Sequence, residues 1–157
     1  MSLPIIEQIA VELKATLETI TAANDYDVEV SEVIRPRRTG VPQVPDSYGI
    51  ILLGGDEEPG GHDLIGNPGA RSWRHTFTME LFIRVSEHDE TPIDTLVNVF
   101  ACEVERAVMV DATRGGLAID TRRMGRMFAP PGDGLESVTL IFEVNYRVSE
   151  VDARTRV

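Results

Sequence analysis

The segment Ser72–Ser86 constrains the fold most strongly, because apolar side chains alternate with mainly polar ones over its whole length. An alternation with a period of two predicts a β-strand that buries one of its faces. A slip of one residue would expose the whole apolar row, so we expect its register to be firm. Phe82 is the exception on the polar side. The apolar row is Trp73, His75, Phe77, Met79, Leu81, Ile83 and Val85.

Two segments show the period of a helix instead. Residues 3–22 carry isoleucine and leucine at three- and four-residue spacing, which predicts an amphipathic helix. A second helix is predicted to begin at Thr91-Pro92, with Thr91 as its cap and Pro92 in its first turn. Gly115-Gly116 follows it as a turn. Its predicted buried stripe includes Leu96, Phe100 and Val104.

The remaining patterns predict four further strands and complete the fold class. The order α-β-β-β-α-β-β predicts an α+β domain, with a mainly antiparallel five-stranded sheet and two helices packed on one face. One domain is expected over residues 1–157, with a frayed tail at about 152–157. The four strands are expected at Tyr26–Ile34, Ser47–Gly54, Leu117–Phe128 with a bulge at Gly125, and Leu135–Glu150.

Residues 54–71 are expected to form a long polar loop, because "GGDEEPGGHDLIGNPGA" holds six of the 13 glycines. Long loops are usually functional, and three roles are open here: catalysis, ligand binding and assembly. Its acidic run Asp56, Glu57 and Glu58 would repel a copy of itself unless basic groups met it. Two arginine clusters on a neighbouring chain could do so, or could serve only solubility. They are Arg35, Arg37 and Arg38, and Arg122, Arg123 and Arg126.

No constellation of catalytic or metal-binding residues is found in the sequence. The histidines His62, His75 and His88 lack the spacing of a metal site, and Cys102 is the one cysteine. The glycine-rich segment lacks the ligand pattern of a calcium loop and the lysine of a phosphate-binding loop. We therefore expect no enzymatic activity, no cofactor and no metal.

Charge and hydropathy exclude two classes of partner. The formal net charge of -11 argues against tight binding to nucleic acid through its phosphates. No apolar run approaches the length that spans a bilayer, and the N-terminus lacks a basic-then-apolar signal pattern, so we expect neither membrane insertion nor secretion.

The two longest predicted strands favour self-association. Ser72–Ser86 and Leu135–Glu150 exceed the usual five or six residues. Long strands in a small domain leave open edges, and such edges need a partner. Trp73, at the start of the first of these strands, is expected to be partly exposed in the monomer and buried on assembly.

The whole chain resembles the tail terminator and tail completion proteins of long-tailed bacteriophages. The likeness covers roughly residues 3–152 and rests on element order and wording, not on an invariant motif. The segments that carry it are "LPIIEQIAVELKATLETI", "VIRPRR", "YGIILL", "W-x-x-x-F-x-M-E-L-F-I-R-V", "TPIDTLVNVFACEVERAVM" and "SVTLIFEVNYRVSE".

The resemblance implies a structural virion protein that is assembled in the host cytoplasm. It implies a hexameric ring at the head-proximal end of the tail, where the ring stops tube polymerisation and joins the tail to the head connector. Its partners would be copies of itself, the tail tube protein and a head-completion protein, and DNA would pass through without specific binding. Two alternatives stay open: another ring-forming neck or tail protein, or a soluble small-molecule-binding domain with its site at residues 54–71.

Overall fold

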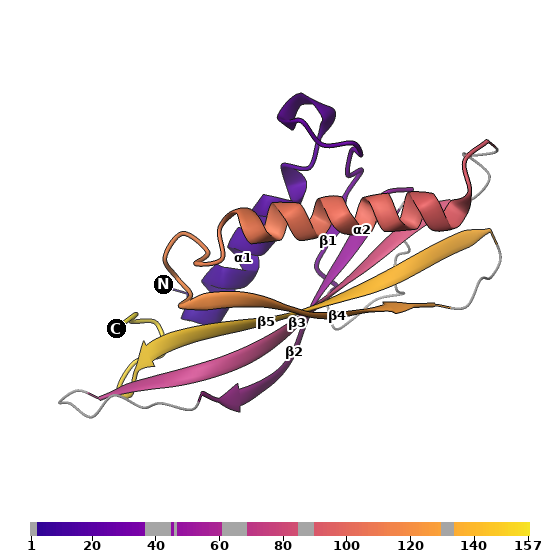
Figure 1. The fold of residues 1–157 in the computed structure, drawn as a ribbon. Coiled ribbons are helices and arrows are strands. Elements are labelled where there is room, and N and C mark those ends of the chain that lie inside the picture. The colour runs from indigo at the N-terminus through magenta and orange to yellow at the C-terminus, as the bar shows by residue number, and fades with distance from the viewer. Residues whose placement is uncertain (1–2, 37–44, 46, 61–68, 85–89, 130–133) are drawn as a thin grey trace.

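A computed structural model describes residues 3–36, 45, 47–60, 69–84, 90–129 and 134–157. It is an α+β fold with a five-stranded mixed sheet and two long helices, which lie on the same side of the sheet (Figure 1). The elements follow the predicted order. They are α1 (Ile5–Glu18), the short 3-10 helix η1 (Ala22–Asn24), β1 (Val33–Ile34), β2 (Gly49–Pro59), β3 (Ala70–Arg84), α2 (Ile93–Val110), β4 (Asp120–Phe128) and β5 (Leu135–Ser149).

The strands lie in the order β1-β2-β3-β5-β4. β1 runs parallel to β2, and every other neighbouring pair is antiparallel. The central pair β3 and β5 is matched over the whole of β3, from Ala70 opposite Ser149 to Arg84 opposite Leu135. The alternation that predicted these two strands is therefore confirmed.

The core lies between the helices and one face of this central pair. From β3 it takes the predicted row around Phe77 and Leu81, and from β5 the alternate residues from Val138 to Val148. The helices add Ile9 and Leu13 of α1 with Phe100 and Val104 of α2, all of them buried. Burial of apolar surface stabilises a folded chain by about 25 cal/mol per Å², so this one cluster is the main source of the stability of the fold.

The expected loop at residues 54–71 is wrong at both of its ends. Gly54–Pro59 belongs to β2 and Ala70 begins β3, while residues 61–68 lie outside the described part of the chain. Several of the glycines allow close approach of two strands. A Cβ on Gly60 would lie 2.6 Å from the Cβ of Ser72, and one on Gly55 would lie 3.0 Å from the carbonyl oxygen of Thr76.

The predicted strand Tyr26–Ile34 is also wrong over most of its length, since only Val33–Ile34 is strand. The preceding residues bond elsewhere. The Val30 N–H donates to the Ile20 carbonyl at 2.9 Å, and the Arg106 guanidinium of α2 lies 4.3 Å above the Tyr26 ring. The side chain of Val28 is still buried, so the alternation marks burial without sheet pairing.

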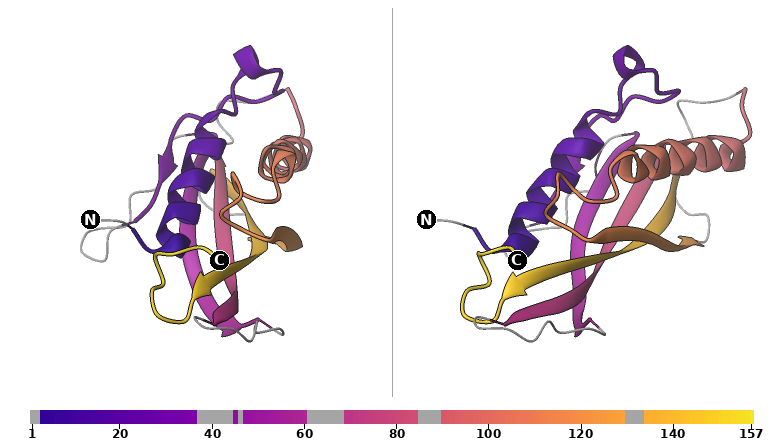
Figure 2. Two further views of the ribbon diagram at one scale, coloured as in Figure 1. Left: turned by 90° about the vertical axis from the view of Figure 1, so that its left-hand side faces the viewer. Right: turned by 60° about the vertical axis from the view of Figure 1, so that its left-hand side comes forward.

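Two smaller predictions change at the ends of elements. Thr91 does not cap α2, because Pro92 occupies the N-cap position and no side chain bonds there. β4 begins at Asp120, not Leu117, but its register does shift between Arg123 and Gly125, which confirms the bulge. The tail at 152–157 is exposed, and the Ala153 carbonyl accepts a bond from the Ile5 N–H, so the two ends of the chain lie close together (Figure 2).

Candidate assembly surfaces

In the described part of the chain, the sheet has an open edge on each of its two sides. β1 pairs with β2 only at Ile50 and Ile51, so no described strand lies beyond β2 from Leu52 to Pro59. β4 ends the strand order on the other side, and no strand in the described ranges pairs with its outer edge. Unpaired N–H and C=O groups of an edge strand are a template for pairing with another chain.

Pro59 fits the open side of β2. The Ile50 N–H points away from β3, toward Glu32, whereas the Gly60 N–H bonds to Ser72 of β3 at 2.7 Å. N–H groups of successive strand residues point to opposite sides, so the nitrogen of Pro59 faces the open edge. A proline there costs the sheet no hydrogen bond.

The open part of β2 carries the acidic run, which the structure places on a strand and not on a loop. Asp56 is exposed, and its side chain has no hydrogen bond or ion pair among the described residues. Glu58 forms an ion pair with Arg74 at 3.2 Å. Glu57 accepts a hydrogen bond from the Tyr146 hydroxyl. Asp56 is thus the member of the run with a carboxylate free for an outside partner.

His75 of β3 is the titratable group beside this acidic run. Its Nδ1 lies 4.0 Å from a carboxylate oxygen of Glu57, and its ring is 4.7 Å from that of Phe77. Burial lowers the pKa of His75 and outweighs the opposite effect of Glu57 and Asp56. Its buried Nδ1 has no hydrogen-bond partner in the described structure. His75 is therefore neutral at neutral pH and does not compensate the charges of Glu57 and Asp56.

The open edge of β4 carries the basic cluster. Arg123 lies 2.7 Å from Glu105 of α2, and Arg126 bonds to the same carboxylate at 2.7 and 2.8 Å. Burial alone would raise the pKa of Glu105, but the hydrogen bonds and charges of Arg126 and Arg123 lower it. One carboxylate thus faces two guanidinium groups, and one positive charge remains. Arg122 pairs with Asp120 at 2.7 Å.

Apolar side chains accompany the arginines on β4. Met124, Met127 and Phe128 are 58%, 57% and 58% exposed. Methionine, arginine and aromatic residues are enriched in protein interfaces. The predicted arginines alone did not reveal this, although "RRMGRMF" holds both kinds of residue. The edge of β4 combines the charge and the apolar area that a partner strand would cover.

The other predicted residues are placed less favourably for assembly. Arg35 makes two bonds to Glu7 of α1, at 2.8 and 2.9 Å, so that it fixes α1 beside the end of β1. Arg37 and Arg38 lie outside the described residues. Within one chain, Arg35, Arg122, Arg123 and Arg126 all have carboxylate partners, and their contact with a neighbouring chain stays a prediction.

Trp73 is half-buried, as predicted for the single chain. It packs against the edge of the core and lies opposite Pro59 of β2 and Tyr146 of β5. Its burial on assembly stays a prediction.

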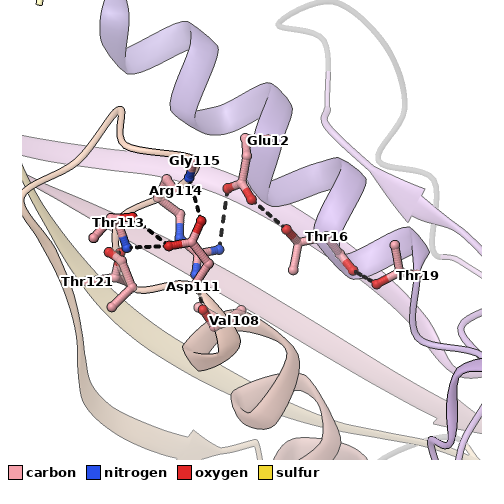
Figure 3. A network of polar contacts seen from close by, with 10 residues as sticks. Glu12, Thr16, Thr19, Val108, Asp111, Thr113, Arg114, Gly115 and Thr121 are labelled. Atoms are coloured by element: carbon pink, nitrogen blue, oxygen red, sulfur yellow. Dashed lines mark hydrogen bonds and ion pairs between the residues drawn. The ribbon is translucent and has the colours of Figure 1, made fainter.

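A polar network around Arg114 was not predicted. Arg114 is completely buried, its guanidinium lies 3.3 Å from Glu12 of α1, and it also donates to the Val108 carbonyl at the end of α2 (Figure 3). Asp111 accepts bonds from the Thr113 hydroxyl at 2.6 Å and from the Gly115 and Thr113 N–H groups at 2.5 and 2.9 Å, and these bonds lower its pKa to about 2. These contacts end α2 and fasten it to α1.

The search for other chemistry gives two findings. Among the described residues, no group of three or more histidine, cysteine, aspartate or glutamate side chains could hold a metal ion. No described helix is both long and apolar enough to cross a membrane. His62 and His88 lie outside the described residues.

No protein-family model matches the sequence, and no curated protein matches it.

Proposed function

We propose that the chain is a structural subunit of a bacteriophage virion that forms a ring at the head-proximal end of a tail tube. The ring, a hexamer by the family resemblance, stops polymerisation of the tube and joins the tail to the head connector. DNA passes through it without specific binding, which suits a chain with a net charge of -11. Assembly takes place in the host cytoplasm.

The observation that carries this proposal is the pair of open sheet edges with opposite charge. The acidic run Asp56–Glu58 lies on β2 at one side of the sheet, and Arg122, Arg123 and Arg126 lie on β4 at the other. A surface that complements a different surface of the same chain gives head-to-tail association, and head-to-tail contacts close into rings when the rotation fits.

The arrangement of the layers also supports the proposal. Both helices cover one face of the sheet, and the opposite face of β3 and β5 has no helix over it (Figure 1). Residues on that face, such as Thr78, Phe82 and Ile141, are partly exposed. A subunit of this shape has surfaces left for neighbours on several sides. Part of the segment on which the ligand-loop alternative rested is now strand β2.

Mass in solution tests the proposal. We expect a single closed species at six times the chain mass of 17.3 kDa, in equilibrium with monomer as concentration falls. Electron microscopy of that species should show rings. Added to a suspension of isolated tail tubes, the rings should bind at one end of each tube only. A chain that stays monomeric at every concentration, or binds along tube walls, would contradict the proposal.

A further inference from the structure

We infer that β4 of one copy pairs antiparallel with the open part of β2 in the next copy, so that neighbouring sheets join into one. This inference rests on the proposed ring and names the surface that builds it. It follows from three features of the described residues: the level of the two charged segments in the sheet, the direction of the two strands, and the faces on which the charges lie.

The two segments lie at the same level across the sheet. Strand pairing puts Glu57, His75, Val144 and Thr121 in one row. A second row joins Gly54 and Phe77 to Phe142 and Arg123. Asp56 lies in the bulge between these rows. β1 covers only the rows of Ile50 and Ile51, which leaves open the part of β2 that is level with Asp120–Arg126.

The direction of the strands fixes the kind of pairing. Three antiparallel steps lead from β2 through β3 and β5 to β4, so β2 and β4 run in opposite directions. Rotation about a ring axis keeps the direction of each strand relative to that axis. β4 of one copy and β2 of the next are therefore antiparallel, the pairing with the more stable hydrogen-bond geometry.

The charges match on both faces of such a joint. Glu57 lies opposite His75 on the helix side of the sheet, and Arg123 and Arg126 reach α2 on that same side. Glu58 pairs with Arg74 on the other face, where Arg122 lies opposite Glu143. Glu57 and Glu58 thus each face a side on which β4 of the neighbour presents an arginine.

Charged edge strands also protect proteins against aggregation. For that role it is enough that the edges of two copies repel each other. Here each edge has one predominant sign and the two signs differ. Two β2 edges would repel each other, as would two β4 edges, whereas β2 and β4 attract. The segregation therefore permits the head-to-tail joint and opposes the two symmetric ones.

A charge swap in the full-length chain tests the joint. Glu57→Arg and Arg123→Glu, at residues that lie on the same face of the sheet, are made singly and together. The concentration at which half of the chains are assembled is measured by sedimentation or mass photometry. We expect each single change to raise it about tenfold or more, because like charges would meet at every joint, and the double change to bring it back toward wild type. Glu29→Arg and Arg154→Glu, matched reversals at exposed sites away from both edges, should leave it unchanged.

The outcomes separate this inference from the proposed function. Wild-type rings whose assembly is indifferent to both single changes would overturn the β2–β4 joint and leave the ring in place. A wild-type chain that never assembles would overturn both. Arg123→Glu puts a second carboxylate beside Glu105, so if it lowers the melting temperature, Arg122→Glu replaces it in the swap. Because Arg122 points to the other face, its partner in the rescue is then Glu58→Arg.

Discussion

The guanidinium of Arg114 lies 3.3 Å from the carboxylate of Glu12 and joins the end of α2 to the middle of α1. Arg114 is completely buried, and its second partner is the carbonyl of Val108. The Glu12 side chain is 27% exposed, so removal of Arg114 acts mainly through the cavity that it leaves and through the Val108 carbonyl, which loses its donor.

Arg114→Ala should therefore lower the free energy of unfolding by about 2–3 kcal/mol. Denaturation with urea measures the change. Arg154→Ala serves as the control, because Arg154 is exposed and lies away from both sheet edges, so its removal should leave stability almost unchanged. An Arg114→Ala protein as stable as the control would show that the network around Arg114 does not hold the helices together.

Phe100→Ala should be similarly costly for a different reason. Phe100 is completely buried on α2, and its ring stands edge-on to that of Tyr48 with 5.3 Å between the ring centres. Its removal leaves a cavity, and we expect a loss of about 3–5 kcal/mol in the free energy of unfolding. Val110→Ala on the same helix, where the side chain is 78% exposed, should change stability by less than about 0.5 kcal/mol. A loss below about 1 kcal/mol for Phe100→Ala would mean that α2 does not pack on the sheet as described.

Acid should destabilise the protein through His75. Burial lowers the pKa of His75 in the folded chain below its ordinary value of 6.5, so the unfolded chain binds the proton more readily. Stability is then fully present above that ordinary value. It falls as the pH drops below it, until the pKa of the folded state is reached.

His75→Gln should flatten this part of the stability profile. The measurement is the free energy of unfolding at a series of pH values on both sides of 6.5, for wild type and variant. His62 and His88 are present in both proteins, so their titration cancels in the comparison. Two parallel profiles would show that burial of His75 has no energetic effect.

Trp73 should report assembly by its fluorescence. It is the one tryptophan of the chain, and it is half-buried at the row of Pro59, next to the open part of β2. Covering that edge should remove water from the indole ring and shift its emission to shorter wavelength as rings form. A dilution series followed by emission and by mass should give the same midpoint. An emission maximum that stays constant across a measured monomer-to-ring transition would exclude Trp73 from the interface.

The strands β3 and β5 could be predicted from the sequence because apolar residues alternate with mainly polar ones along both, and the apolar residues are the ones that the fold buries. The second half of β2 could not. Gly54, Gly55 and Asp56 are poor strand formers, and they are strand here because β3 lies beside them and the glycines let it approach. Pairing of this kind depends on segments that are far apart in the chain.

The candidate site shows the same division. The sequence identified the acidic run and the basic cluster, and composition alone suggested that they meet. It did not indicate that they occupy opposite edges of one sheet at the same level, because that requires the strand order. Arg114 gave no signal at all, since its partner Glu12 lies 102 residues away and a lone arginine in a turn is usually solvated.

The bulge between Gly54 and Glu57 bears on the number of copies in the proposed ring. Each subunit added to the proposed ring covers one open edge and presents another of the same kind. The chemistry of the edges therefore does not by itself set the number of copies in the ring. The number depends on the angle by which each sheet turns from the last, and a bulge bends its strand and increases the local twist. In the proposed ring, tightness and stoichiometry are thus separate properties: we expect edge charges to govern the first and the curvature of β2 to govern the second.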